Sequence, residues 1–315
     1  MKLQTHIKLQ PSSIQFGYED KLLLLGSCFA ENIGAKLAYH KFQAVTNPFG
    51  IIFNPVALER LVQDAVANKT YTEEDVFEHQ GIWKSFVAHS NLNASSRLEA
   101  VIRLQEAQQE LRTCIAEASH IFITLGTAWV YKHIQLDQVV ANCHKVPQKE
   151  FQKELLSEEE VHDSLLQICQ YIKSLNPKVH IVFTVSPVRH TKDGFVENMR
   201  SKAHMITAIH KLVDAKQVFY FPAYELLMDE LRDYRFYALD MLHPSEQAVN
   251  YVWERFIEVY AFAKAKQALT KVASIQKRKS HKPFNSESEE HKAFVKNVEL
   301  DIAKLKETHP SIDFI

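Results

Sequence analysis

The sequence has little glycine and no long apolar run. Only 7 of its 315 residues are glycine, and the phosphate-binding patterns GxGxxG and GxxxxGK[ST] are absent, so a flavodoxin-like nucleotide binder is poorly supported. No apolar stretch approaches the ~20 residues that span a bilayer, and the N-terminal residues lack the apolar segment of a signal peptide. We therefore expect a soluble, cytoplasmic protein without a membrane span.

The chain also has almost no net charge, and it lacks closely spaced cysteine pairs and a metal-binding motif. Lys and Arg number 37 against 38 Asp and Glu, a formal net charge of -1 that gives no general attraction to nucleic acid. The four cysteines include no CxxC pair, as is typical of reduced cytosolic thiols, and the 16 histidines include no HExxH. Cys143 and His144 are adjacent, but two neighbouring ligands make a poor metal site. We expect neither a metal nor another cofactor, and the oligomeric state stays open.

Apolar segments that alternate with helical patterns predict a parallel sheet. Residues 21–25, 120–126 and 179–188 are apolar runs typical of strands buried on both faces, and helical patterns alternate with them along the chain. This alternation indicates an α/β fold with a mostly parallel sheet and helices on both faces, in which ligands bind outside the carboxyl ends of the strands. The weaker elements expected are strands at residues 42–45 and 218–221 and a loop-rich insertion at residues 127–151.

The character of the chain changes near its C-terminal end. We expect one large domain over residues 1–265, because its apolar content is that of an ordinary globular protein. Residues 266–290 are basic and then acidic with few large apolar side chains, which predicts a charged, partly disordered linker. Residues 291–315 show helical spacing and predict a C-terminal helical extension that packs back or meets a partner.

Ser27 follows the first predicted strand and opens a helix. A helix N-terminus offers free N–H groups and a positive partial charge, which suits a serine nucleophile whose substrate forms an oxyanion. Serine is also a preferred N-cap, so the position alone favours a structural role. The adjacent Cys28 is a second nucleophile by residue type, although cysteine is more often a buried residue.

Asp240 and His243 shift the interpretation towards catalysis. The segment LDMLHPS places an acid three residues before a histidine, at a spacing that lets a turn bring both side chains to one side. The carboxylate can then hold the imidazole Nδ1–H and leave Nε2 free to take a proton from a serine. A surface pair that arose by chance is the alternative. The order Ser27, Asp240, His243 on an α/β sheet favours a catalytic triad.

Several segments resemble the GSCFA family, named after the motif that LGSCFAENIG contains around Ser27. The similarity covers roughly residues 22–258, and its further blocks are NPFGIIFNP, VANCHKVP, TVSPVRH and DELRDYRFYALDMLHPS. The family resembles a branch of the SGNH (GDSL-like) hydrolases. That resemblance implies a flavodoxin-like three-layer α/β/α sandwich and a reaction on esters, thioesters or acyl groups.

The resemblance also implies roles for individual residues. Ser27 matches the nucleophile, Asp240 and His243 match the acid–histidine pair, and the backbone N–H groups of Ser27 and Gly50 match oxyanion donors. Where SGNH enzymes have Gly-x-Asn, this chain has Gly126-Thr127-Ala128, so a carboxamide donor is missing. Losing one such donor typically costs ~10²–10³ in turnover. The residues considered as replacements are the Thr127 hydroxyl, Asn47, Asn142 and Asn198.

The remaining candidates concern substrate binding. Arg189 and His190 follow a strand and suit a substrate carboxylate or phosphate, although a loop salt bridge fits them equally. Asn142 and His144 lie in a stretch that resembles a substrate or lid element, and Asn47 is a further binding candidate.

Together these features predict a serine-dependent hydrolase. Its expected substrate is a small-molecule or carbohydrate ester, such as an acyl ester or an O-acetyl group. Two alternatives stay open: an acyltransferase that uses the same serine, and a catalytically inactive SGNH-like binding protein, which the missing carboxamide favours.

Overall fold

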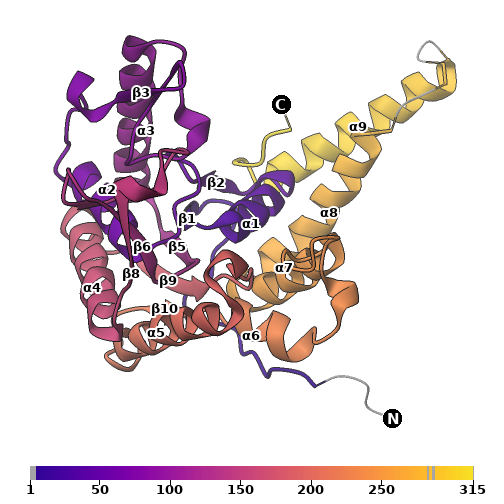
Figure 1. The fold of residues 1–315 in the computed structure, drawn as a ribbon. Coiled ribbons are helices and arrows are strands. Elements are labelled where there is room, and N and C mark those ends of the chain that lie inside the picture. Colours follow the sequence, from indigo (N-terminus) through magenta and orange to yellow (C-terminus); the bar gives the residue numbers. More distant parts are fainter. Residues whose placement is uncertain (1–4, 282–283, 286–287, 315) are drawn as a thin grey trace.

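The computed structural model describes residues 5–281, 284–285 and 288–314. Five parallel strands form the central sheet (Figure 1). If only these five strands are numbered, in chain order, their order in the sheet is 2-1-3-4-5, which is that of a doubly wound sheet. The switch point of such a sheet lies between strands 1 and 3, which here are β1 and β5. In spatial order they are β10 (Phe219–Tyr220), β9 (His180–Val185), β5 (His120–Leu125), β1 (Lys21–Gly26) and β2 (Gln43–Thr46).

Helices lie on both sides of the central sheet (Figure 1). Alternate side chains of the strands face these two helical layers. Leu23 and Leu25 belong to one buried cluster, and Leu22 and Leu24 to another, because successive side chains of a strand point to opposite faces. The predicted three-layer α/β/α architecture is therefore confirmed. One layer comprises α2 (Pro55–Val66), α3 (Arg97–Glu117), α4 (Glu158–Leu175) and α5 (Phe195–Asp214); the other comprises α1 (Cys28–Tyr39), α7 (Glu246–Tyr260) and α8 (Ala263–Lys279).

Residues 127–151 contain the loops that the sequence predicted, together with short strands that it did not predict. They carry strands of a small antiparallel sheet, in which aromatic and β-branched residues such as Trp129, Val130 and Tyr131 favour extended backbone. A separate hairpin precedes α3. The strands of the small sheet are β6 (Trp129–His133), β7 (Gln138–Val139) and β8 (Phe151–Leu155), and those of the hairpin are β3 (Phe77–His79) and β4 (Ile82–Lys84).

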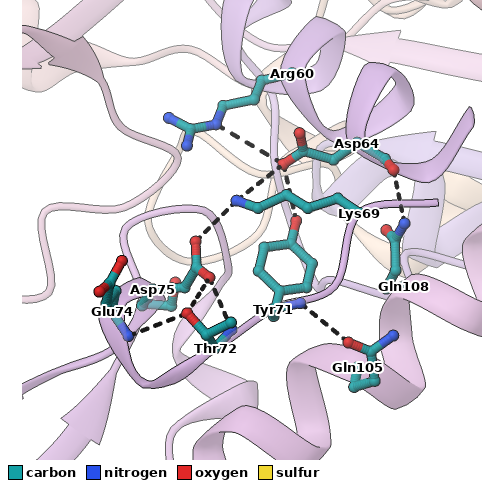
Figure 2. A network of polar contacts seen from close by, with 10 residues as sticks. Arg60, Asp64, Lys69, Tyr71, Thr72, Glu74, Asp75, Gln105 and Gln108 are labelled. Carbon is teal, nitrogen blue, oxygen red and sulfur yellow. Dashed lines mark hydrogen bonds and ion pairs between the residues drawn. The ribbon is translucent and has the colours of Figure 1, made fainter. Parts of the chain in front are cut away.

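A polar network ties the loop before this hairpin to α2 and α3 (Figure 2). Lys69 Nζ lies 2.8 Å from the Asp75 carboxylate and 3.7 Å from that of Asp64. The Tyr71 hydroxyl donates to Asp64 at 3.1 Å, and Gln108 Nε2 donates to the Asp64 carbonyl at 2.7 Å. The hairpin is thus fastened to the helical layer by charge-assisted hydrogen bonds as well as by apolar packing.

The prediction of a linker over residues 266–290 is wrong for most of that range, because α8 occupies it as far as Lys279. The buried face of α8 consists of two alanines and two β-branched residues, spaced three or four positions apart: Ala265, Ala268, Val272 and Ile275. The scarcity of large apolar side chains misled the sequence prediction, because an alanine stripe allows close helix packing without them. Residues 282–283 and 286–287 of the predicted linker lie outside the described residues.

The predicted C-terminal helix is present as α9 (Glu289–Thr308). It lies beside α8 (Figure 1), with Val298 and Leu305 buried and Asp301 in an ion pair with Arg278 at 2.8 Å. In the stretches that the structure describes, no helix has the length and apolarity required to cross a membrane.

Candidate active site

Ser27 lies at the carboxyl end of β1, where the strand turns into α1. It caps the helix, and its hydroxyl accepts a hydrogen bond from the Phe29 N–H at 3.3 Å. The turn requires glycine at position 26, because φ there is +125° and a Cβ would lie 2.1 Å from the Thr124 carbonyl oxygen. Ser27 is 3% exposed and borders the switch point between β1 and β5, where ligands of such sheets bind.

The segment after β2 crosses the ends of β1 and β5. Asn47 Oδ1 accepts the Gly26 N–H at 2.8 Å, and the Ile52 N–H donates to the Gly26 carbonyl at 3.1 Å. Further along, the Gly126 N–H donates to the Phe53 carbonyl at 2.8 Å. Residues from three strand ends are therefore joined by backbone and amide hydrogen bonds around Ser27.

Asp240 and His243 form the predicted pair. Nδ1 of His243 lies 2.6 Å from Oδ2 of Asp240, while Oδ1 of Asp240 accepts the N–H groups of His243 at 3.0 Å and of Leu242 at 2.9 Å. These backbone hydrogen bonds, with that of the imidazole, lower the pKa of Asp240 to about 2. A charged carboxylate accepts only, so Nδ1 carries the proton and the Nε2 lone pair is available. The side chains of His243 and Asp240 are 52% and 46% exposed.

His190 lies at the end of β5, beside Phe53 and Gly126. Its ring packs 5.1 Å from that of Phe53, and Nε2 would lie 3.1 Å from a Cβ at Gly126. Burial lowers the pKa of His190 to about 4, and the charges of Lys202 and His243 act in the same direction. His190 is thus a buried neutral ring at the end of β5.

The second contact of the predicted triad, between Ser27 and His243, is not formed among the described residues. Within the described residues, the Ser27 hydroxyl bonds only with the Phe29 N–H, and Nε2 of His243 has no hydrogen-bond partner. Two of the three residues are brought together, and the pairing of Ser27 with His243 stays a prediction.

The predicted oxyanion donors have other partners in this structure. The Ser27 N–H donates to the Thr124 carbonyl at 3.0 Å, and the Gly50 N–H donates to the Asn47 carbonyl at 2.7 Å. The Thr127 hydroxyl lies 3.0 Å from Ser201 Oγ and also accepts the Trp129 N–H at 3.0 Å. An oxyanion role for these three groups therefore requires a change in their hydrogen bonding and stays a prediction.

A model of the GSCFA family matches residues 21–256, which include the whole central sheet and both parts of the candidate site. The chain belongs to the GSCFA family. A second model, described as the C-terminal domain of GSCFA domain proteins, matches residues 272–314, from within α8 to beyond α9. No match to the chain is found among curated proteins.

Two predicted binding residues of this GSCFA chain lie within a structural loop. Asn142 Oδ1 accepts the His144 N–H at 2.8 Å, and the buried His144 ring donates through Nε2 to the carbonyls of Ser85 and Ala88. Both contacts fasten the loop after β4, and none of them involves the segments around Ser27. A substrate role for Asn142 and His144 stays a prediction that these contacts do not support.

Arg189 borders a groove that does not include Asp240 or His243. The groove has a volume of about 250 Å³ and is also lined by Arg232, Met228 and Tyr237. The Arg189 guanidinium lies 5.5 Å from the centre of the Tyr237 ring, and Tyr237 forms a bridge to Pro244, the residue after His243. The Arg189 guanidinium contacts Met228 and Tyr237 rather than a carboxylate among the described residues, and its binding of an anionic substrate group stays a prediction.

Helix α5 supplies buried polar residues that the sequence analysis largely missed. Asn198 Oδ1 accepts the His190 N–H at 2.9 Å, and Ser201 Oγ accepts the Ala128 N–H at 2.7 Å. Lys202 is 1% exposed. A signal was present, because Lys202 falls between Asn198 and Met205 on the buried stripe of the helix, where a lysine is unusual.

Cys28 is a poor alternative nucleophile in this family member. Burial and the nearby Glu31 carboxylate raise the pKa of its thiol, against a smaller opposite effect of Lys202. The reactive thiolate is therefore disfavoured, which leaves the Ser27 hydroxyl as the better candidate. Across the described residues, no cluster of three or more His, Cys, Asp or Glu side chains is arranged to hold a metal ion.

Proposed function

We propose that this GSCFA protein is a serine hydrolase that cleaves carboxylic esters, with Ser27 as nucleophile and His243 and Asp240 as its activating pair. The observation that carries the proposal is the 2.6 Å contact between His243 Nδ1 and Asp240, which leaves Nε2 as a base without a partner among the described residues. The doubly wound sheet and the chain order Ser27, Asp240, His243 support kinship with SGNH hydrolases.

The proposed reaction has two halves. As Ser27 Oγ bonds to the carbonyl carbon, its proton moves to His243 Nε2 and the carbonyl π electrons move to the oxygen. Collapse of this oxyanion breaks the bond to the alcohol, which leaves with the proton from the imidazolium. Water then attacks the acyl carbon, His243 takes its proton, and Ser27 regains a proton as the carboxylic acid leaves.

Asn47 is the best side-chain candidate for the missing carboxamide. Its Oδ1 is fixed by the Gly26 N–H, one residue before the nucleophile, and its Nδ2 lies only at the limit of hydrogen bonding from Glu31 Oε1, at 3.5 Å. An amide held on one side and weakly bonded on the other suits an oxyanion donor.

A binding protein without catalytic activity is the second candidate. The buried Ala128 in place of a carboxamide donor and the small exposed fraction of Ser27 favour it. An acyltransferase would use the same acyl-enzyme, with a hydroxyl or amine in place of water.

Hydrolysis of a short-chain aryl acetate tests the proposal. We expect the wild-type protein to release the phenol and Ser27→Ala to lose the activity, whereas Cys28→Ala, which removes the rival nucleophile, retains it. A folded wild-type protein that neither hydrolyses the ester nor transfers its acyl group to an added alcohol or amine would favour the binding protein.

A further inference from the structure

Lys202 is a buried lysine at the carboxyl edge of the sheet. Its Nζ donates hydrogen bonds to the carbonyl oxygens of Gly126 and Ser186, each at 2.7 Å. Gly126 directly follows β5 and Ser186 directly follows β9, so one ammonium group joins the ends of two neighbouring strands. These carbonyls belong to the same edge as the candidate active site.

The sheet register places this bridge close to the nucleophile. Gly26 of β1 pairs with Thr124 of β5, so Cys28 and Gly126, two residues further along each chain, follow the paired ends at the same edge. Cys28 is close enough for its charge and that of Lys202 to influence each other. Lys202 therefore lies near the first turn of α1, which Ser27 caps.

The ammonium has no carboxylate partner within the described residues. The titratable groups that face it are Cys28 from α1, His190 from the loop before α5, and Tyr224 of α6 (Ala223–Glu225), whose ring centre is 6.0 Å from Nζ. Lysine is almost never fully buried without a counter-ion, and desolvation lowers the pKa of Lys202 to about 7. A positive charge at this position is most stable when a negative charge forms nearby.

We propose that the Lys202 ammonium supplies a positive charge that stabilises the oxyanion formed at Ser27, in addition to the hydrogen-bond donor proposed at Asn47. This inference rests on the proposed ester hydrolysis. Lys202 acts as a positioning residue: it fixes the Gly126 and Ser186 carbonyls, and its field acts on the oxyanion through a region of low dielectric, where a charge has a larger effect than in water. The side chain of Ala128 itself is buried and apolar, and its N–H is bonded to Ser201.

A purely structural clamp is the alternative, and the two roles differ in their dependence on pH. In a structural role, Lys202 can donate hydrogen bonds to the two carbonyls both as a neutral amine and as an ammonium, so this role persists at any pH. Stabilisation of an oxyanion needs the protonated form. We expect kcat of the wild-type enzyme to fall as the pH rises through about 7, the region in which Lys202 loses its proton.

The experiment compares kcat and KM for an aryl acetate between pH 5.5 and about 9.5 in wild type, Lys202→Met and Lys202→Arg, a range that brackets the pKa. Lys202→Met should lower kcat at pH 6 by about 10–100-fold with little change in KM, and should lack the alkaline fall. Lys202→Arg, which stays charged, should recover part of kcat and also lack that fall. Lys84→Met, a matched change at a buried lysine of β4, should keep the wild-type profile.

The outcomes separate this inference from the proposed function. If wild type is active and Lys202→Met keeps either the wild-type kcat or the alkaline fall, the role of the charge is overturned while ester hydrolysis stands. If Lys202→Arg behaves as Lys202→Met at every pH, the ammonium acts as a clamp and the inference is likewise overturned. A folded wild type without activity refutes the proposed function, and the role of Lys202 with it.

Discussion

The Asp240 carboxylate is bonded both to backbone N–H groups of its own turn and to the His243 ring. One carboxylate oxygen accepts two N–H groups of the turn, and the other accepts the imidazole Nδ1–H. The acid therefore sets both the tautomer and the orientation of the ring, which is the function of the acid in a triad. Because the pair is about half exposed, its side-chain contact contributes little to stability.

Asp240→Asn should separate these contributions. An asparagine still accepts the two backbone N–H groups through Oδ1, but its amide donates towards Nδ1 and favours the wrong tautomer. We expect kcat to fall by about 10²–10⁴ while the melting temperature changes by no more than about 2 °C. Unchanged esterase turnover in Asp240→Asn would mean that the pair is a surface contact without a catalytic role.

Lys202 also predicts a dependence of stability on pH. Its pKa is about 7 in the folded protein and near 10.5 when exposed, so between these values the unfolded chain binds a proton that the folded chain does not. Stability relative to Lys202→Met should therefore rise with pH across this window, by at most about 1.4 kcal/mol per pH unit, and be lowest below pH 7. Urea unfolding of both proteins at several pH values measures the difference, and parallel curves would show that Lys202 does not titrate inside the fold.

At the scale of elements, the turn from β1 to α1 positions Ser27, the proposed nucleophile. Gly26 has the backbone conformation that starts the turn, Ser27 caps α1, and the chain after β2 covers the same edge. The sequence indicated this arrangement, because an apolar run ending in Gly-Ser before a helical pattern is typical of a strand that feeds a helix. The small sheet containing β6 was not predicted, because short amphipathic strands carry too few apolar residues to stand out from loops.

Gly26→Ala tests the turn. At φ +125° a Cβ would meet the Thr124 carbonyl oxygen at 2.1 Å, so we expect a loss of at least about 2–3 kcal/mol in the free energy of unfolding. Gly81→Ala is the matched control, since φ is +73° there and no atom lies within 4 Å of the added Cβ, and it should lose only about 1 kcal/mol. Equal losses in chemical denaturation would show that the close approach to β5 is unimportant.

At the scale of the whole molecule, the C-terminal helices belong to the same core as the sheet. Ile275 of α8 and Val298 of α9 share a buried cluster with Leu22, Leu24 and Phe122 of the strands. The long βαβ pattern made the architecture predictable from sequence, whereas the location of the site at the strand ends stays a prediction. Spatial partners were not predictable: neither the packing of α8 in this cluster nor the approach of Lys202 to two strand-end carbonyls leaves a periodic signal along the chain.

Ile275→Ala should therefore destabilise the entire fold. Removing a side chain that is 2% exposed should cost about 2–4 kcal/mol and shift the unfolding transition monitored by circular dichroism and by tryptophan fluorescence equally. Leu300→Ala, at an α9 side chain that is 49% exposed, serves as the control with a change below about 1 kcal/mol. Two separated transitions in Ile275→Ala would indicate that the C-terminal helices fold as an independent unit.

Reaction with a fluorophosphonate, followed by mass mapping of the modified peptide, examines the nucleophile most directly. The reagent phosphonylates a serine only where a base activates its hydroxyl. We expect one adduct per chain, on Ser27, and its loss in His243→Ala although that protein remains folded. An unmodified Ser27 in the folded wild-type protein, or an adduct that forms equally fast without His243, would contradict the account.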